Sequence, residues 1–527
     1  MNKYLLVALS VLSGILLGLA WTTSCSGLIL LISFVPFLII ENVLYHSAVR
    51  YHRNAFFLYT LPGFFIFNIL AIGWVRVSTL TGAVFIIMGL SFLMSFTLWL
   101  AHIIRLKAGN PAGYISLISF WLALEYINLN TSIITPWLNL GNGLAKDILF
   151  IQWYDITGAA GGTLWIISTN LAFSAWINKF ISKKNFNNIY LWFALALVIL
   201  PSTISFLRYY NIEQNESGAM EVVIIQPNVD PYTDKFSIPF MHQWDNALSM
   251  AESAVTEKTL WVITPETTID DPVNEDDAHS DKYIIKAKDF ISRHSDVTLI
   301  TGMVGCRSFP DTIGNEEPDS LYFNSAFKID TGNRIEIYHK SKLVPGVEMQ
   351  FSTGPLKLLA RLLPYFGGTQ WGYTIQKERI NFEHSSRKTK IAPVICYESV
   401  YGNFVAEYVR NGAEAIFIIT NDGWWKNTNG YNQHLAYASL RAVETRRPVA
   451  RAANTGISCI IDIKGKRITE SDWWTTAVIT GNLYPETRIT PYVKYGEYLM
   501  RIASLISILI LTIVFVAIPL RNKNKNF

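Results

Sequence analysis

The stretch "IAPVICYESVYG" (391–402) ends an apolar, β-branched run with a cysteine, and a glutamate follows two positions later. In α/β proteins, ligands bind just beyond the carboxyl ends of the strands, where such a run would place Cys396. On its own, a lone cysteine after an apolar run is more often a small buried hydrophobe than a nucleophile. The rest of the chain has to decide between these two interpretations.

Other runs of the same character predict further strands, at 220–229, 260–266, 297–305, 322–330 and 414–424. Segments with a helical pattern lie between some of them, at 281–295 and 401–413. Near-continuous apolar strands that alternate with helices indicate an α/β domain whose sheet is covered on its faces. Glu266, Cys396 and Asn421 each close one of the apolar runs, so we expect them at strand ends.

A lysine completes a chemically complementary set in "IYHKSKLVPGVE" (337–348), where Lys340 follows a short strand and precedes a Pro-Gly turn. Taken separately, a turn lysine, a strand-end glutamate and a lone cysteine are ordinary structural residues. Together they can perform acyl transfer, because a cation beside a thiol lowers its pKa from about 8.5. Glu266 could take the thiol proton and Lys340 could stabilise an oxyanion. No histidine is required.

The composition describes a membrane protein with a soluble domain. Half of the residues are hydrophobic and only 16% are charged, against the usual quarter. The net charge of +4 is small and scattered, which gives no argument for binding nucleic acid. The four cysteines lie far apart without CxxC spacing, so we expect no disulfide framework and no metal site.

Long apolar runs predict eight membrane-spanning helices, at 4–21, 27–45, 56–75, 82–101, 113–129, 155–177, 189–206 and 502–520. The predicted organisation is therefore a seven-helix region (1–210), a catalytic domain (218–490), a closing helix (498–520) and a cytoplasmic tail (521–527). A cleaved signal peptide ending near Cys25 is the alternative for the first run.

Basic residues give the orientation of these helices. With the N-terminus inside, eleven lie on the inner segments: Lys3, Arg50, Arg53, Arg105, Lys107, Lys179, Lys183, Lys184, Arg521, Lys523 and Lys525. Only Arg76 and Lys146 lie on the short outer loops. Positive charge is retained on the cytoplasmic side, so both termini are predicted to be cytoplasmic and the domain at 218–490 extracytoplasmic.

The motifs "TPETT" (264–268), "YHKSKLVPGVE" and "ICYESVYG" resemble the Glu, Lys and Cys motifs of the nitrilase, or carbon–nitrogen hydrolase, superfamily. The plan of the whole chain is similar to the apolipoprotein N-acyltransferase family of the bacterial inner membrane. "TPWLNLGN" (135–142), "IQWYDITGAAGGTLWIISTN" (151–170) and "VIIQPNVDPYTDKF" (223–236) fit the membrane part and the entry strand of that family.

The resemblance implies an αββα sandwich with Glu266 as general base, Lys340 as oxyanion stabiliser and Cys396 as nucleophile. It also implies supporting roles for Glu348, Tyr397 and Glu398. Trp424 and Trp425 could line an acyl pocket or pack in the core. One departure is that Gly346 and Val347 stand where the family usually has Phe-Gly. The apolar segment 353–373 is expected to be either a packed helix or an amphipathic flap at the membrane surface.

The expected reaction moves a fatty acyl chain from a phospholipid to the amino terminus of a diacylglyceryl-modified lipoprotein, through a cysteine thioester. The expected protein is a monomer in the bacterial inner membrane, with its catalytic domain on the periplasmic side and no cofactor. One alternative is a membrane-tethered amidase, against which seven preceding helices argue. The other is a transporter or receptor with a non-catalytic outer domain, which would not require Glu266, Lys340 and Cys396 together.

Overall fold

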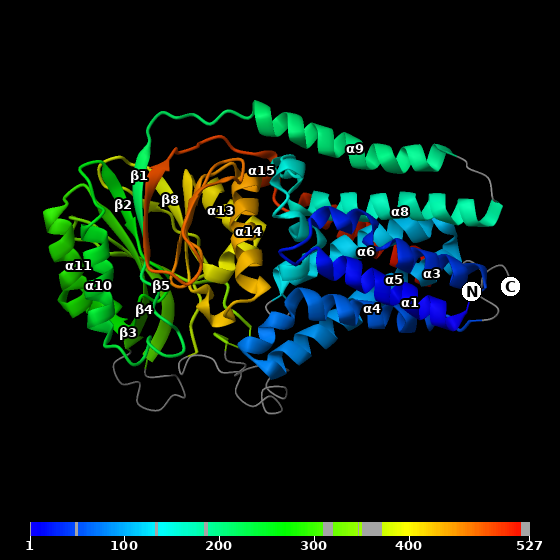
Figure 1. The fold of residues 1–527 in the computed structure, drawn as a ribbon, viewed down its shortest axis with the longest axis horizontal. Helices are drawn as coiled ribbons and strands as arrows, with labels where there is room; N and C mark the ends of the chain where they lie inside the picture. The colour runs from blue at the N-terminus through cyan, green and yellow to red at the C-terminus, as the bar shows by residue number, and fades with distance from the viewer. Residues whose placement is uncertain are drawn as a thin grey trace. The chain divides into compact units, whose positions relative to one another are not determined.

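The computed structural model describes residues 2–47, 51–131, 135–183, 188–308, 320–345, 347–349 and 372–517. Gly346, most of the segment 353–373 and the tail at 521–527 therefore lie outside the described residues. The chain divides into two compact units (Figure 1). Unit 1 comprises Met1–Arg76, Leu80–Asn211 and Tyr495–Phe527, and unit 2 comprises Val77–Thr79 and Ile212–Lys494.

Unit 1 is helical. Its longer helices are α1 (Lys3–Leu19), α3 (Val35–His46), α4 (Ala55–Ile72), α5 (Leu80–Ala108), α6 (Asn110–Asn130), α8 (Ala159–Lys183), α9 (Asn188–Asn211) and α16 (Tyr498–Thr512). Shorter helical pieces are η1 (Gly27–Ile29), α2 (Leu30–Ser33), η2 (Gly73–Val77), η3 (Pro136–Leu138), η4 (Leu140–Leu144), η5 (Ile148–Phe150), α7 (Tyr154–Thr157) and η9 (Ile513–Ala517).

Six helical stretches within the described residues are long and apolar enough to cross a membrane: Gly27–His46, Ala55–Val77, Leu80–Ala108, Asn110–Asn130, Ile189–Asn211 and Tyr498–Ala517. Each coincides with one of the eight spans predicted from the sequence. The remaining two predicted spans form helices that are not among the six. Helix α1 has 17 residues, and α8 has 25 residues with a less apolar composition. A count of eight spans is therefore not confirmed.

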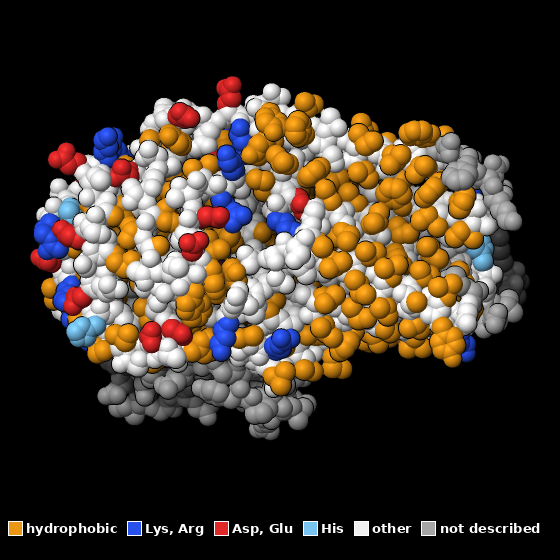
Figure 2. All heavy atoms as spheres, viewed as in Figure 1, with side chains coloured by type: hydrophobic (Ala, Val, Ile, Leu, Met, Phe, Trp, Pro, Cys, Tyr) orange, Lys and Arg blue, Asp and Glu red, His pale blue; other side chains and the backbone are white. Residues whose placement is uncertain are grey.

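Small residues let helices α1 and α4 approach closely. A Cβ atom on Gly14 would lie 2.1 Å from the carbonyl oxygen of Gly63, and one on Gly63 would lie 2.4 Å from the carbonyl oxygen of Ser10. Close backbone approach at small residues is a common way for helices to pack within a membrane. The outer surface of this unit is apolar: Figure 2 shows hydrophobic side chains over most of its visible face, and Leu58 and Ile508 are more than 60% exposed.

Glu125 is a buried acidic residue within the apolar helix α6. Its Oε1 accepts hydrogen bonds from the Leu140 backbone N–H at 2.7 Å and from Trp121 Nε1 at 3.1 Å. Its Oε2 accepts one from the Thr163 hydroxyl at 2.8 Å. A carboxylate within a membrane helix is costly unless it is paired, and here it organises the backbone of η4.

Unit 2 contains two mixed β-sheets. The first has the strand order β13-β1-β2-β4-β5-β6, with β3 also paired to β4, and the second has the order β12-β11-β10-β9-β8-β7. The strands of the first sheet are β1 (Met220–Gln226), β2 (Thr259–Ile263), β3 (Ile269–Asn274), β4 (Thr298–Ser308), β5 (Ser320–Ile329), β6 (Glu336–His339) and β13 (Ala477–Leu483). Those of the second are β7 (Phe382–Glu383), β8 (Lys390–Ile395), β9 (Ala415–Thr420), β10 (Val449–Ala453), β11 (Cys459–Ile461) and β12 (Arg467–Glu470).

Helices cover the outer faces of both sheets, which gives an αββα sandwich. Helices α10 (Phe240–Glu252) and α11 (Lys282–Arg293) pack on the first sheet, and α13 (Gly402–Arg410) and α14 (Asn429–Thr445) pack on the second (Figure 1). Between the sheets, Trp261 of β2 meets Phe417 of β9 edge-on, with ring centroids 5.3 Å apart. Strands β2 and β9 are buried at every position, as expected for strands covered on both faces.

The α/β fold class predicted from the sequence is confirmed for this unit. Each predicted strand is present, although β2, β8 and β9 end earlier than the apolar runs suggested, at Ile263, Ile395 and Thr420. The polar residues Glu266, Cys396 and Asn421 therefore lie just beyond strand ends rather than inside strands. Strands β3, β7 and β10 to β13 were not predicted.

Candidate active site

A glycine in β4 positions the loop that carries Glu266. This loop joins β2 to β3, and its Pro265 carbonyl accepts a hydrogen bond from the Gly302 N–H at 3.1 Å. A Cβ atom on Gly302 would lie 2.5 Å from the Pro265 carbonyl oxygen and 2.6 Å from the Glu266 Cα. Only glycine lets the strand and the loop approach so closely, which fixes the start of the Glu266 side chain.

Strand β6 delivers Lys340 to the same edge of the sheet. Strands β4, β5 and β6 are successively antiparallel, so β6 runs parallel to β4 and β2, and its carboxyl end lies with theirs. The Lys340 N–H continues the ladder by donating to the Asn324 carbonyl at 2.8 Å. The side chain is 1% exposed, so the ammonium group is removed from water.

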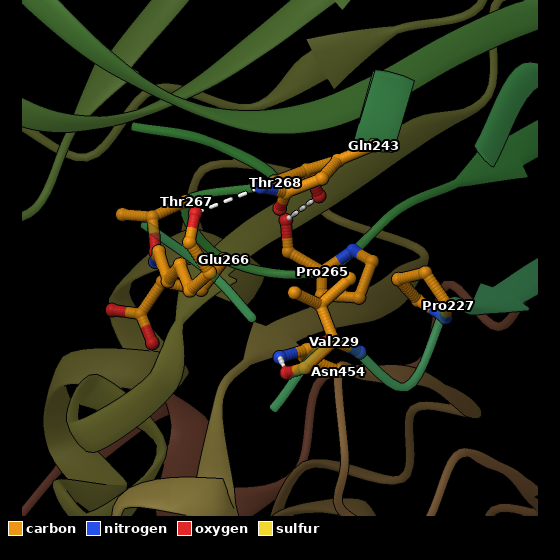
Figure 3. Close-up of a pocket in the computed structure, with 9 residues that line it drawn as sticks. Pro227, Val229, Gln243, Pro265, Glu266, Thr267, Thr268 and Asn454 are labelled. Atoms are coloured by element: carbon orange, nitrogen blue, oxygen red, sulfur yellow. Dashed lines mark hydrogen bonds between the residues drawn. The ribbon is translucent and has the colours of Figure 1, made fainter. Parts of the chain in front are cut away.

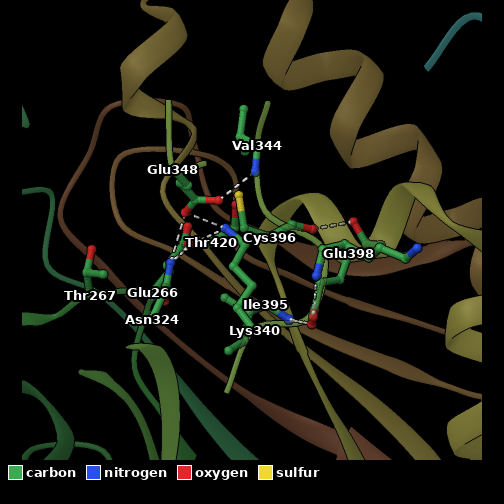
Figure 4. A network of polar contacts seen from close by, with 12 residues as sticks. Glu266, Thr267, Asn324, Lys340, Val344, Glu348, Ile395, Cys396, Glu398 and Thr420 are labelled. Carbon is green, nitrogen blue, oxygen red and sulfur yellow. Dashed lines mark hydrogen bonds and ion pairs between the residues drawn. The ribbon is translucent and has the colours of Figure 1, made fainter. Parts of the chain in front are cut away.

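The Lys340 ammonium lies between two carboxylates (Figure 4). Nζ donates to Glu266 Oε1 at 2.8 Å and to Glu348 Oε1 at 2.8 Å. Glu348 is held in turn by the Val344 N–H, which donates to its Oε2 at 2.8 Å. The predicted Glu266, Lys340 and Glu348 are thus in direct contact.

Asn324 of β5 bridges the same two carboxylates and was missed by the sequence reasoning. Its Nδ2 donates to Glu266 Oε1 at 2.8 Å and to Glu348 Oε1 at 3.1 Å. Its side chain is buried, and no hydrogen bond to its Oδ1 is found within the described residues. A buried amide in the middle of an apolar strand was the available signal, because such a group requires partners.

Cys396 lies at the end of β8, in the first position of η7 (Cys396–Val400). Its φ of +50° is in the left-handed region, which non-glycine residues rarely adopt and which often marks functional sites. The thiol lies within hydrogen-bonding reach of the Glu266 carboxylate and of the Thr420 side chain at the end of β9. The structure therefore brings Glu266, Lys340 and Cys396 together from three different strand ends.

Burial, together with the charge of Glu266, keeps the thiol protonated. Burial raises the pKa of Cys396 well above its usual value, and Glu266 raises it further while Lys340 lowers it. The expected effect of the neighbouring cation is present, since Lys340 lowers the thiol pKa, but burial and the charge of Glu266 outweigh it. Burial also raises the pKa of Glu266, but Lys340 and the hydrogen bonds to this carboxylate outweigh burial and hold it below its usual value.

Lys340 remains an ammonium group. Burial lowers its pKa, but the charges of Glu266 and Glu348 outweigh burial and raise the pKa well above its usual value. The resting arrangement is accordingly a thiol, a carboxylate base and an ammonium group in contact. This arrangement suits proton transfer during attack rather than a preformed thiolate.

Glu398 and Tyr397 lie next to the nucleophile in the chain, in η7. Glu398 Oε1 accepts hydrogen bonds from the Tyr338 hydroxyl at 2.7 Å and the Ser341 N–H at 2.6 Å, and its Oε2 accepts one from the Ile395 N–H at 2.9 Å. It therefore ties the segment after Lys340 to the end of β8, and burial raises its pKa to about 7. The Tyr397 hydroxyl accepts a hydrogen bond from Tyr401, and the two rings meet edge-on.

The two tryptophans after β9 form η8 (Asp422–Trp425) with the residues before them. Trp424 is 36% exposed and packs against Tyr232, whose hydroxyl donates to the Trp424 carbonyl at 2.7 Å. Trp425 contacts the buried His434 edge-on.

A small cavity lies on the backbone side of Glu266 (Figure 3). Its lining includes Lys235, Thr267 and Asn454, and its volume of about 10 Å³ is close to that of one water molecule. The Glu266 carboxylate points away from the other lining residues (Figure 3). This cavity is too small for an acyl chain. Among the described residues, no group of three or more His, Cys, Asp or Glu side chains could hold a metal ion.

Two family profiles match the chain. The carbon-nitrogen hydrolase profile matches residues 224–490, and the apolipoprotein N-acyltransferase N-terminal domain profile matches residues 13–172. The apolipoprotein N-acyltransferase of Chlorobaculum tepidum is 26% identical, over 93% of this chain and 92% of its own length. The Haemophilus influenzae enzyme of the same name is 24% identical, over 97% of this chain and 95% of its own length.

Among solved structures, Saccharomyces cerevisiae Nit3 of the nitrilase superfamily aligns with a TM-score of 0.38 and 15% identity. The alignment covers 51% of this chain and 90% of the Nit3 chain. The family profile, which spans more than half of the chain, makes this protein a member of the carbon–nitrogen hydrolase family. With the membrane domain included, the chain belongs to the apolipoprotein N-acyltransferases. It is an N-acyltransferase and a multi-pass protein of the inner membrane.

Proposed function

We propose that the chain transfers a fatty acyl group from a phospholipid to the N-terminal α-amino group of a diacylglyceryl-cysteine lipoprotein, through a thioester on Cys396. The relatives named above, which match over more than nine-tenths of their length, support the overall reaction. One observation carries the assignment of residues. The Glu266 carboxylate lies within hydrogen-bonding reach of the Cys396 thiol and accepts a hydrogen bond from the Lys340 ammonium at 2.8 Å.

In the first half-reaction, Glu266 accepts the thiol proton while the sulfur attacks the carbonyl carbon of a phospholipid ester. Negative charge develops on the carbonyl oxygen, where a Lys340 N–H can stabilise it. An ammonium group has three N–H bonds, and Glu266 and Glu348 accept two of them. The C–O bond then breaks, Glu266 returns the proton to the leaving oxygen, and a lysophospholipid departs.

In the second half-reaction, the lipoprotein amine attacks the thioester carbonyl. Glu266 accepts the amine proton, Lys340 again stabilises the oxyanion, and the C–S bond breaks as Glu266 returns the proton to sulfur. Because both substrates are anchored in the bilayer, a membrane-attached enzyme raises their effective concentration. Exclusion of water from the thioester would favour transfer over hydrolysis.

The membrane arrangement remains part of the proposal. We infer eight crossings, in which α1 and α8 add to the six apolar helices, because 17 and 25 residues are both within the range that spans a bilayer. The excess of basic residues on alternate loops supports cytoplasmic termini and a periplasmic catalytic domain.

The proposal is tested by incubating the purified protein with phospholipid labelled in its acyl chain and with a diacylated lipopeptide. We expect label first on Cys396 and then on the peptide amine, and no labelled enzyme for Cys396→Ser, since Glu266 is matched to a thiol and not to a hydroxyl. Hydrolysis of soluble amides without acyl transfer would favour the amidase alternative. Label on Cys25, Cys306 or Cys459 would contradict the choice of nucleophile.

The role of Lys340 can be separated from simple loss of a buried charge. Lys340→Met should slow thioester formation on the order of 10²–10³-fold with phospholipid binding retained. Lys328 offers a matched control, because it is also buried between two carboxylates, those of Asp330 and Glu336, in another part of the sheet. Lys328→Met should lower thermal stability but not the acylation rate of the folded enzyme.

A further inference from the structure

A buried network of polar side chains lies beneath Cys396 and takes no part in the reaction described above. His434 of α14 lies with its Nε2 3.1 Å from the Cys396 carbonyl oxygen and its Nδ1 2.9 Å from Asp422 Oδ1. Ser399 lies 2.8 Å from the same Nε2, and its hydroxyl donates to the Cys396 carbonyl at 2.8 Å. His434, Asp422 and Ser399 are all fully buried.

The order Ser399, His434, Asp422 resembles a hydrolytic triad, but its surroundings exclude that chemistry. A nucleophilic serine must reach a substrate, whereas Ser399 is 0% exposed and its hydroxyl is committed to the Cys396 carbonyl. The contacts converge on one backbone oxygen instead. Because a carbonyl oxygen and a carboxylate oxygen can only accept, hydrogen bonds to Cys396 and to Asp422 require a proton on each of Nε2 and Nδ1 of His434.

The oxygen that receives these contacts belongs to the residue with the unusual backbone. Cys396 has a φ of +50°, a conformation that persists in a non-glycine residue only where its surroundings enforce it. Rotation of this backbone would redirect the thiol away from Glu266. Two donors on the Cys396 carbonyl, one from His434 and one from Ser399, oppose that rotation.

Asp422 anchors the other side of the imidazole ring. It forms an ion pair with Arg451, which is itself buried, and accepts a hydrogen bond from the Thr420 hydroxyl at 2.9 Å. Thr420 also contacts the Cys396 thiol. This polar network therefore contacts Cys396 both at its backbone carbonyl and at its sulfur atom.

We propose that His434, oriented by Asp422, is a positioning residue that holds the Cys396 carbonyl and thereby aims the thiol at Glu266. The proposal rests on Cys396 being the nucleophile, and His434 itself touches neither substrate. Loss of the Nε2 contact should slow the chemical step while the affinity for phospholipid stays unchanged.

Two conservative substitutions separate the two contacts of the ring. The amide nitrogen of His434→Asn takes the place of Nδ1, so it keeps a donor for Asp422 but cannot reach the Cys396 carbonyl. The amide nitrogen of His434→Gln takes the place of Nε2 and keeps that donor. His384 supplies matched control variants, because it is equally buried and its Nε2 lies 3.2 Å and 3.0 Å from the carbonyls of Leu260 and Asp296.

The variants are made in full-length protein with Cys25, Cys306 and Cys459 changed to Ala, so that Cys396 is the only thiol. Alkylation of Cys396 by iodoacetamide, and kcat and KM for labelled phospholipid, are then measured. We expect His434→Asn to lower the alkylation rate and kcat on the order of 10²-fold, as small misplacements of a reacting group do, with KM within about twofold. His434→Gln should stay within about threefold of the parent, and His384→Asn should match the parent.

Wild-type alkylation by a folded His434→Asn variant would overturn the proposal, as would equal losses in His434→Asn and His434→Gln or the same loss in His384→Asn. If His434→Asn does not fold, the Ser399→Ala variant is measured in its place, because it removes the second donor to the Cys396 carbonyl. A slower rate with unchanged KM then supports the proposal, and a parental rate overturns it. Failure of phospholipid to label Cys396 in the parent would instead refute the proposed function, since alkylation does not depend on acyl transfer.

Discussion

At the scale of single residues, the charge balance around Lys340 determines how the nucleophile is activated. One ammonium group serves two carboxylates, so little positive charge remains to stabilise a thiolate in the resting enzyme. The energetic cost of ionising Cys396 is met only during attack, when Glu266 takes the proton and the new negative charge moves to the substrate oxygen.

This activation mode predicts the pH dependence of acylation. The pKa of Glu266 lies below its usual value and that of Cys396 well above its own. Glu266 is therefore already ionised above its ordinary pKa of about 4.3, and no thiolate accumulates near the ordinary cysteine value of about 8.5. Single-turnover thioester formation should be nearly flat from about pH 5.5 to 8.5 and should fall only in more acidic solution. A tenfold rise per pH unit up to about pH 8.5 would show that a preformed thiolate reacts instead.

Asn324 should matter as much as a residue of the predicted set. Asn324→Leu removes the donor that Glu266 and Glu348 share, so we expect acylation to slow by about 10²-fold and the fold to lose about 1–3 kcal/mol. Asn381→Leu is the control, because Asn381 donates to the carbonyls of Tyr408 and Asn411 outside the site. It should lower the melting temperature and leave the acylation rate unchanged. If both variants slowed acylation equally, the role of Asn324 would be structural and not specific to the site.

At the scale of elements, the contact between β4 and the β2–β3 loop sets the position of the base. Gly302→Ala would push its Cβ against the backbone of Pro265 and Glu266, which has no flexible atoms to yield. We expect a folded protein whose acylation rate falls on the order of 10²-fold.

Gly481 in β13 provides the comparison within the same sheet. A Cβ atom there would meet only the Ile460 Cδ1 atom at 2.6 Å, and this flexible side-chain end can move aside. Gly481→Ala should therefore leave the acylation rate near the wild-type value. If Gly302→Ala were equally active in the same assay, the loop would be held by other contacts.

The strand-end residues could be predicted from the sequence because apolar runs that stop at a polar residue mark both the strand and its end. The chemistry of Glu266, Lys340 and Cys396 followed from residue type. Asn324 escaped prediction because it lies within a strand, next to Ser325, and polar residues within a strand usually face solvent. His434 lies in a helix of mixed polarity, and nothing in the local pattern shows that the Cys396 carbonyl lies next to it.

The protonation state of the thiol could not be predicted for a different reason. It depends on how deeply Cys396 is buried and on the charges of Glu266 and Lys340 beside it, and these surroundings form only after the chain has folded. The two tryptophans illustrate the same limit. Trp424 and Trp425 adjoin a strand end in sequence, but their rings pack on Tyr232 and His434.

At the scale of the whole molecule, the distribution of basic residues predicts the sidedness of the protein. Single cysteines introduced at Lys3 and at an exposed position of unit 2, such as Lys258, should be labelled from opposite sides of the membrane. An impermeant thiol reagent added outside should reach position 258 in spheroplasts, and position 3 only after permeabilisation. If the cysteine at position 258 reacts only after the protein is unfolded, its side chain is buried. If it reacts only after the membrane is permeabilised, unit 2 lies on the cytoplasmic side and the predicted orientation is reversed.

The discontinuity of unit 1 has a consequence for how the protein is made. Helix α16 packs against α6, and Met500 and Ala503 join Leu122 and Ala160 in one apolar cluster. Residues 212–494 are synthesised between these helices, which takes on the order of tens of seconds during translation. Throughout that interval the α6 face has no protein partner and must be covered by lipid or by the insertion machinery. The membrane part therefore reaches its final packing only after the catalytic domain has been translated, so a chain interrupted within that domain would present an incomplete helix bundle to cellular quality control.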